Sequence, residues 1–341
     1  MKMGRLKQRL GKWGSAVGHK LVISRAAPVV SAALMGFSIF GHAGSAHAVE
    51  DVTPFIPGGT IGAPVGLLPP PGVYGMIGVG RFDFKGRGDT GRDTGVRIEN
   101  YPIGLGVLWV TDLQILGASY GIGVVQPVRY HTITTPTVSA DQFGIVNTIL
   151  NVGTLSWRLG NGFAVSAGLN IYPNVGKYTL GRPINPARNY ATFEPRLGLS
   201  YVKDGWHLSS NIVFNVNEEN EARRFQSGTL VATDLTATRR IFDKLDFGLG
   251  STIIYQFTDD LRAGEPTPAA GGRGRGGRAR FVSLGPVMSY DFGAFVLSLY
   301  YQRTVLAENT AGGHQIWSRI NFPIYSTRPA TQPELESAGR R

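Results

Sequence analysis

The chain has 341 residues, with 34 Lys and Arg, 23 Asp and Glu, and no Cys, so its formal net charge is +11. The absence of Cys excludes a disulfide scaffold and a thiolate metal site. No window reaches the ~20 consecutive apolar residues of a membrane-spanning helix, so any membrane role requires alternating strands. Glycine occurs 47 times, which is about twice its usual frequency.

Residues 1–48 are typical of a secretory signal peptide. Seven Lys and Arg and no acidic residue lie here, together with the apolar run AAPVVSAALMGFSIF at 26–40 and the cleavage site AHA at 46–48. The alternative is an amphipathic surface helix, which the proline and glycine within the apolar run oppose. Cleavage leaves 27 basic and 23 acidic residues, a net charge of +4. Nucleic-acid binding, which the high pI would otherwise suggest, is therefore not expected.

Residues 49–72, VEDVTPFIPGGTIGAPVGLLPPPG, combine many Pro and Gly with large apolar side chains. The segment is too short for a domain and too apolar for an ordinary flexible tether. Its apolar side chains need cover. Two interpretations stay open, a plug folded into the lumen of a following barrel and a loose periplasmic tail.

The remainder of the chain, 73–324, reads as strands. In FAVSAGLNIYP at 163–173 apolar residues alternate with Ala, Ser, Gly and Asn, which is a period of two. The same pattern predicts twelve strands, at 73–84, 101–111, 115–127, 143–158, 163–173, 191–203, 206–216, 228–240, 245–257, 280–290, 295–304 and 314–324.

The polar face of these strands carries small neutral residues, whereas a soluble sheet would expose charged ones. In a bilayer every backbone polar group needs a partner, so strands must close into a barrel with an apolar outer face. The sequence therefore predicts an all-β transmembrane antiparallel barrel whose apolar face contacts lipid. A secreted soluble β-sandwich is the alternative.

The predicted connections alternate between long and short. The long ones are 85–100, 128–142, 174–190, 217–227, 258–279 and 305–313, and the short ones are 112–114, 159–162, 204–205, 241–244 and 291–294. Outer-membrane barrels have short periplasmic turns and long external loops, and aromatic residues gather at their two interfaces. The interfacial candidates are Tyr172, Trp206, Tyr255, Tyr290 and Tyr301. Residues 325–341 are expected to form a polar C-terminal tail.

Polar residues that fall on the inner face by phase are candidates for contact with a solute. They are Asn170, Arg196, Asn211, Asn215, Asp246, Gln256, Gln302 and Arg319. A charge that faces the lumen needs water or a partner. These side chains form either a constriction that orients a solute or a structural ion-pair network.

Two loops carry charged motifs. The run GRGRGGRAR at 272–280 contains Arg273, Arg275, Arg278 and Arg280, and guanidinium groups on an external loop suit lipopolysaccharide phosphates. The alternative is that these arginines only keep the loop soluble. The loop at 86–95 contains Arg87-Gly88-Asp89, and Asp89 with Asp93 could attract calcium, but a solvated loop is the simpler interpretation.

Few residues could support catalysis or bind a metal. Only His131, His207 and His314 follow the cleavage site, and His207 lies two residues from Ser209 on one strand face, where a nucleophile and its base rarely meet. No cluster has metal-ligand spacing. The sequence predicts neither an enzyme nor a cofactor.

An ordered set of short motifs spans residues 69–324. They are Pro70-Pro71-Gly72, LWVTDLQILGASYGIGVVQP at 108–127, Phe193-Glu194-Pro195, NEEN at 217–220 with FQSG at 225–228, YQFTDD at 255–260 and GRARFVSLGP at 277–286. Through these motifs and their order, the chain resembles the outer-membrane family of meta-pathway phenol-degradation proteins. Two features depart from the family, YPNVGKY at 172–178 and the residues that follow Ile324.

The resemblance implies a Gram-negative outer-membrane channel for small hydrophobic compounds, aromatic ones included, with no degradative chemistry. Its expected partners are outer-membrane lipid and lipopolysaccharide, the barrel insertion machinery and a small hydrophobic solute. A structural or adhesive barrel with a blocked lumen is the main alternative, and an outer-membrane hydrolase is a third.

Overall fold

The structure is a computed structural model, which describes residues 54–267 and 277–326. The expected signal peptide and most of the expected C-terminal tail lie outside these ranges. Within the described residues, no helix is long and apolar enough to cross a membrane.

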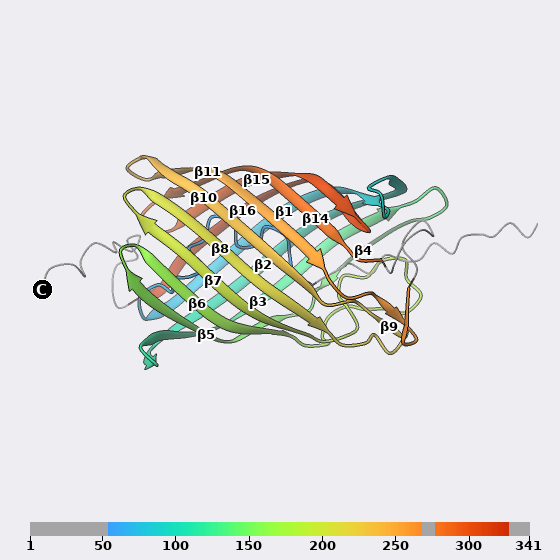
Figure 1. The fold of residues 1–341 in the computed structure, drawn as a ribbon, viewed down its shortest axis with the longest axis horizontal. Helices are drawn as coiled ribbons and strands as arrows, with labels where there is room; N and C mark the ends of the chain where they lie inside the picture. The colour runs from blue at the N-terminus through green and yellow to red at the C-terminus, as the bar shows by residue number, and fades with distance from the viewer. Residues whose placement is uncertain (1–53, 268–276, 327–341) are drawn as a thin grey trace, which may run out of the picture. The chain divides into compact units, whose positions relative to one another are not determined.

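The described residues fold as one antiparallel sheet and a small satellite sheet (Figure 1). The large sheet contains β1 (Gly72–Arg87), β2 (Asp93–Ile115), β3 (Ala118–Thr134), β4 (Ser139–Ile145), β5 (Ile149–Gly160), β6 (Phe163–Tyr172), β7 (Thr192–Lys203), β8 (Trp206–Asn217), β10 (Leu230–Phe242), β11 (Leu245–Gln256), β14 (Arg280–Asp291), β15 (Val296–Glu308) and β16 (Thr310–Ser326). The satellite sheet contains β9 (Phe225–Gln226), β12 (Leu261–Arg262) and β13 (Glu265–Pro266).

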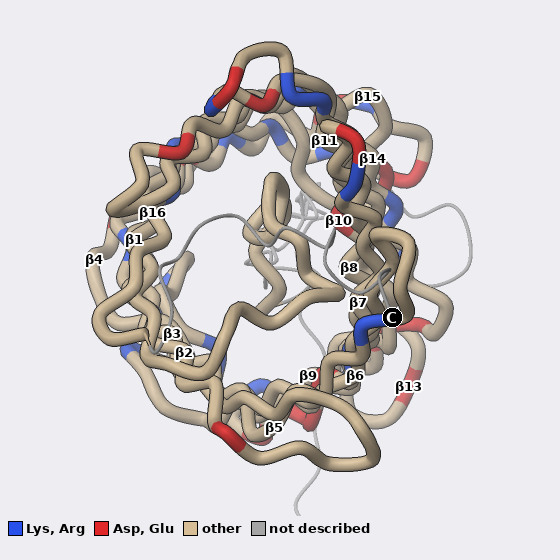
Figure 2. Tube along the Cα trace, turned by 90° about the vertical axis from the view of Figure 1, so that its left-hand side faces the viewer, with Lys and Arg blue, Asp and Glu red and all other residues tan. Residues whose placement is uncertain are grey.

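The large sheet closes on itself because its first and last strands pair, with register from Gly72↔Ser326 to Arg87↔Thr310. Strands β4 and β5 pair with successive parts of β3 and share one position in the wall. The result is a closed antiparallel barrel of twelve strands, seen along its axis in Figure 2. The predicted fold class is confirmed. The single strand expected at 143–158 is wrong, because residues 146–148 interrupt the ladder.

The turns at one end of the barrel are tight. Leu116-Gly117, Asn161-Gly162 and Asp204-Gly205 all have positive φ, between 49° and 84°. Paired positive φ values are typical of two-residue hairpins whose twist matches that of the strands. The first of these turns lies beyond the predicted 112–114.

The other end of the barrel differs from the predicted one. Long loops were expected at 85–100, 128–142 and 305–313, but the strands there continue to short connections at 88–92, 135–138 and Asn309. The apolar alternation stops in these extensions, while backbone pairing continues and ion pairs such as Arg97–Asp83, at 2.8 Å, link neighbouring strands. Apolar alternation therefore predicts strands that end before the observed ones do. The loops between β6 and β7, β8 and β10, and β11 and β14 are long, as expected.

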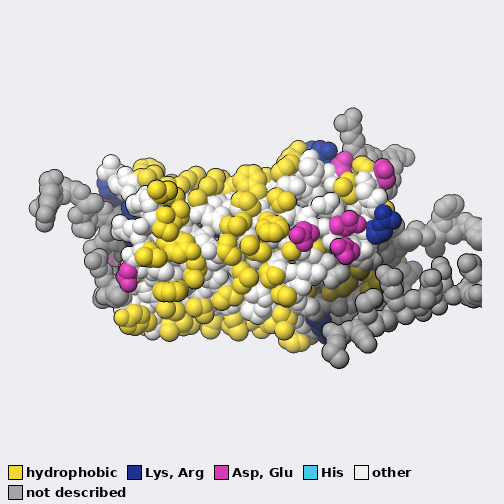
Figure 3. Space-filling view, turned by 90° about the horizontal axis from the view of Figure 1, so that it is seen from below, with side chains coloured by type: hydrophobic (Ala, Val, Ile, Leu, Met, Phe, Trp, Pro, Cys, Tyr) yellow, Lys and Arg dark blue, Asp and Glu magenta, His cyan; other side chains and the backbone are white. Residues whose placement is uncertain are grey.

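The outer surface is apolar around the middle of the barrel, where yellow side chains form a broad band between ends that carry charge (Figure 3). In β11, Phe247 and Leu249 are 48% and 54% exposed, whereas Asp246 and Gly250 are buried. β6 alternates in the same sense, with Phe163 exposed and Ala164 buried. Such a band cannot face water over this area. The apolar face points outward, as the sequence predicted.

Candidate functional site

The segment that precedes β1 lies inside the barrel, against the inner wall. Residues 54–71 are called the inner segment below. Backbone N–H groups of this segment donate to inward-facing hydroxyls on four strands: Gly62 to Thr236 (2.9 Å), Val65 to Ser209 (3.2 Å), Gly66 to Ser200 (2.9 Å) and Leu68 to Ser156 (3.1 Å). These hydroxyls come from β10, β8, β7 and β5. The segment has no strand ladder, so its backbone is satisfied by its own turn hydrogen bonds together with the small polar wall residues.

The turn at 58–61 is held from two sides. The Asp234 carboxylate accepts hydrogen bonds from the Gly58 N–H at 3.0 Å, and from the Thr60 N–H and hydroxyl at 3.0 and 2.8 Å. On the other side the Arg319 guanidinium donates to the carbonyl oxygens of Gly59 and Ile61, at 2.6 and 2.7 Å. Hydrogen bonds to charged groups are stronger than neutral ones. The turn is therefore the most firmly attached part of the inner segment.

Apolar contacts also attach the inner segment. Ile61 is fully buried in a cluster with Phe82, Val287, Tyr300 and Trp317, and Phe55 packs in a second cluster with Val213, Leu230, Ala232, Ile254 and Phe281. Glycine in the wall makes this possible. A Cβ atom on Gly250 would lie 2.6 Å from the Ile61 side chain, and one on Gly198 would lie 2.5 Å from the Val65 carbonyl oxygen. The abundant glycine of this wall is thus a docking surface.

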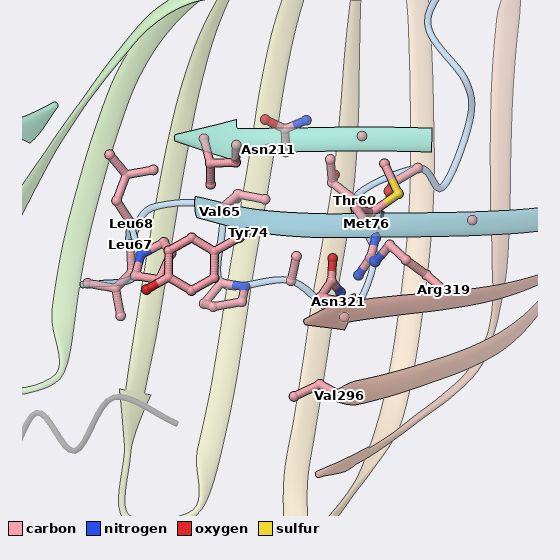
Figure 4. Close-up of a pocket in the computed structure, with 18 of the residues that line it drawn as sticks. Thr60, Val65, Leu67, Leu68, Tyr74, Met76, Asn211, Val296, Arg319 and Asn321 are labelled. Atoms are coloured by element: carbon pink, nitrogen blue, oxygen red, sulfur yellow. Dashed lines mark hydrogen bonds between the residues drawn. The ribbon is translucent and has the colours of Figure 1, made fainter. Parts of the chain in front are cut away.

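A cavity of about 750 Å³ lies beside the inner segment. Figure 4 shows Tyr74 and Met76 of β1 on its border, together with Val65, Leu67 and Leu68. Residues of the barrel wall also line the cavity. They are Gly78 of β1, Gly104, Gly106 and Leu108 of β2, and Gly123 and Val125 of β3. A Cβ atom on Gly104 would meet nothing closer than 3.8 Å. Gly104 therefore leaves space open, whereas Gly198 of β7 and Gly250 of β11 make space that the inner segment fills.

The polar side of the cavity is built around Glu194 of β7, which is 1% exposed. Its carboxylate accepts hydrogen bonds from the amides of Asn170 and Asn215, both at 2.7 Å, and from the Tyr172 hydroxyl at 3.1 Å. Tyr172 is 3% exposed and faces inward. Its predicted place at the membrane interface is therefore wrong, because its phase puts it on the same face as Asn170.

The predicted inner-face residues all point inward, but they have different partners. Asn170, Arg196, Asn211, Asp246 and Arg319 line the cavity. Asp246 pairs with Arg240 at 3.0 Å, and Arg319 binds the inner segment. Asn215, Gln256 and Gln302 do not line the cavity. Gln302 accepts from Ser283 at 3.0 Å and from the Gln315 amide, and Gln256 donates to Asp260 at 2.7 Å.

Two acidic residues of the site, Glu194 and Asp234, were not singled out from the sequence. Glu194 lies in phase with one that was, two positions before Arg196 on the same strand face. An acidic residue inside a predicted membrane strand was the available signal, because such a charge must face the interior and find partners.

Two of the arginines expected to contact lipopolysaccharide lie between β11 and the start of β14. Arg278 pairs with Asp259 at 2.7 Å, and this carboxylate raises the pKa of Arg278. Arg280 lies 3.5 Å from Glu308 and 5.6 Å from the centre of the Tyr255 ring. Both therefore have acidic neighbours that the local sequence run lacks. Arg273 and Arg275 lie outside the described residues.

Other charged and titratable groups of this region are structural. Burial raises the pKa of Asp260, although the Gly228 N–H and the Gln256 amide bind its ionised form. Asp93 of the 86–95 loop lies 3.8 Å from Lys85 and accepts a hydrogen bond from the Gly95 N–H.

His207 and Ser209 both face inward, but Ser209 donates to the Leu199 carbonyl oxygen and contacts Ser200. No hydrogen bond joins this histidine and serine within the described chain.

The closed barrel, its lipid-facing band and its polar interior define a β-barrel protein of the Gram-negative outer membrane. The chain matches, over residues 79–320, the family described as "Putative MetA-pathway of phenol degradation". It belongs to this family, as the sequence motifs indicated. No curated protein sequence matches the chain.

One solved structure shares the fold of this chain, and a second gives a lower score. The COG4313 outer membrane channel from Pseudomonas putida F1 superposes with a TM-score of 0.66 at 13% identity, covering 75% of this chain and 96% of that one. The transport unit of the autotransporter AIDA-I from Escherichia coli gives a TM-score of 0.46 at 10% identity, covering 75% and 90%. At 13% identity the likeness to the Pseudomonas putida protein concerns the fold alone.

Proposed function

We propose that this protein is a passive outer-membrane channel for small hydrophobic solutes, in which the inner segment acts as a fixed plug and solutes pass beside it. The cavity between the inner segment and β1–β3 carries this proposal. Its wall on the side of β1–β3 is mostly apolar or glycine, and the polar side chains that line it come from other strands, among them Arg196, Asp246 and Arg319. A largely apolar wall with a few polar groups is typical of pockets that bind small organic molecules.

The comparisons support the same class of cargo. The family description refers to phenol degradation, and the Pseudomonas putida protein is described as an outer membrane channel. Aromatic compounds are therefore the first solutes to test. We propose no catalytic step, since His207 and Ser209 are separately engaged.

Uptake by intact cells tests the proposal, because an intact lipopolysaccharide leaflet slows the entry of hydrophobic molecules. Cells that produce the protein should take up radiolabelled toluene faster than cells with an empty vector. Gly104→Trp provides the matched control, since Gly104 lines the cavity and a Cβ atom there meets nothing closer than 3.8 Å, so a large side chain can occupy the cavity. Equal uptake by all three strains would refute the proposal.

A structural barrel with a blocked lumen is the second candidate, and the extensive attachment of the inner segment favours it. Planar-bilayer recordings separate the two. We expect a small conductance from the intact protein and a larger one when residues 54–68 are deleted. A blocked barrel would give no conductance and no uptake before deletion.

A further inference from the structure

Two neighbouring polar side chains of the cavity each have one buried atom without a hydrogen-bond partner. Within the described residues, the buried Nε–H of Arg196 donates no hydrogen bond, and the buried Oδ1 of Asn211 accepts none. Both residues line the cavity. Buried polar groups are nearly always satisfied, and each exception calls for an explanation.

The strand register makes these two residues neighbours. Gly198 of β7 pairs with Asn211 of β8, and Arg196 pairs with Val213. Arg196 and Asn211 are thus diagonal neighbours on the inner face, a spacing that long side chains can bridge. One offers a donor and the other an acceptor, so a group that both accepts and donates would satisfy them together.

The surroundings favour a neutral group over an anion. Glu194 lies two positions from Arg196 on the same strand face, and its oxygens are occupied by Asn170, Asn215 and Tyr172. The guanidinium and this carboxylate balance in charge, and a second carboxylate would be repelled by the first. A hydroxyl group avoids this repulsion.

Neighbouring polar residues are already engaged. Arg319 and His207 also line the cavity and also have an unpaired nitrogen. However, Arg319 binds the carbonyl oxygens of Gly59 and Ile61, and His207 interacts with the backbone of Ala63. Their role is to attach the inner segment. Arg196 and Asn211 have no such role.

We infer that Arg196 and Asn211 form a subsite for the hydroxyl group of a small solute whose remainder is apolar. The solute oxygen accepts a hydrogen bond from Arg196, and its hydroxyl hydrogen is donated to Asn211. The apolar part lies against Met76, Leu108 and Val125 across the cavity. This inference rests on the proposed passage of hydrophobic solutes and specifies the chemical class that is bound.

Equilibrium dialysis of protein in lipid nanodiscs tests the subsite, with empty nanodiscs of the same lipid to subtract partitioning. The probes are radiolabelled benzyl alcohol, its methyl ether and benzoate. The methyl ether can accept from Arg196 but cannot donate to Asn211, so the wild-type protein should bind the alcohol about tenfold more tightly, the value of one good hydrogen bond. Benzoate should bind more weakly than the alcohol.

Two variants separate the two contacts. Arg196→Met should weaken binding of both the alcohol and the ether by about tenfold or more, because the donor is lost. Asn211→Leu should weaken only the alcohol and bring it level with the ether. Arg239→Met is the matched control, since Arg239 faces outward over Trp206, and it should bind like the wild type.

Several outcomes would overturn the subsite. These are equal binding of alcohol and ether by the wild type, preferred binding of benzoate, unchanged binding by both inner variants in their folded, heat-modifiable form, or no binding above the lipid background. None of these decides the proposed passage, which toluene uptake measures independently. Faster toluene uptake with equal binding of alcohol and ether would leave the channel in place and remove the subsite.

Discussion

Replacing Asp234 with Ala should release the turn at 58–61 from the barrel wall. The carboxylate accepts three hydrogen bonds from this turn, at 2.8 to 3.0 Å. A hydrogen bond to a charged group contributes about 1.5–3 kcal/mol. Because the three share one acceptor, they are not additive. We expect a loss of roughly 3–5 kcal/mol in the attachment of the turn, because its three donors lose their acceptor and each unsatisfied buried donor costs about 1–3 kcal/mol.

The release can be measured through a single introduced thiol, since the chain contains no Cys. Ile56→Cys places the thiol at the edge of the cavity, next to the turn. Each 1.4 kcal/mol changes the equilibrium tenfold, so Asp234→Ala should raise the rate of maleimide labelling by about a hundredfold or more. Single-channel conductance should rise in parallel.

Thr238→Ala is the control for this experiment. Thr238 lies on the same strand and the same inner face and is 1% exposed, but its hydroxyl is directed to the His207 carbonyl oxygen at 3.5 Å. It should label like the wild type. The reasoning would be refuted if folded Asp234→Ala labelled and conducted as the wild type does, since the carboxylate would then contribute nothing to the attachment.

Three further predictions test the wall. Leu249→Arg should cost about 2–4 kcal/mol of barrel stability, measured by urea unfolding in liposomes, whereas Leu249→Ala should cost much less; equal costs would show that this residue does not face lipid. Gly250→Val should displace Ile61, because the new Cβ would lie 2.6 Å from the Ile61 side chain, and conductance should rise; unchanged conductance would mean that the wall yields instead. Gly104→Trp should lower toluene uptake while leaving labelling at position 56 unchanged, and undiminished uptake would place the solute path elsewhere.

The sequence by itself determined that the chain forms a barrel and that the outer face of this barrel is apolar. Lipid contacts each outward side chain separately, so every second residue of a membrane strand must be apolar, and this local rule can be read without knowing any partner. It correctly placed Leu249 outside and Asp246, Arg196 and Arg319 inside. It failed where the strands extend beyond the apolar band and are held by pairs such as Arg97–Asp83, because lipid no longer imposes the alternation.

Only the tertiary structure decided what the interior contains. Thr60 and Asp234 are 174 positions apart and meet because the barrel closes around the inner segment. The same closure makes Gly250 a docking position and Gly104 an open one, although both are inward-facing glycines. Phase specifies which face a residue occupies, but a contact across the lumen depends on which strands the closed ring sets opposite each other, and no local pattern records that arrangement.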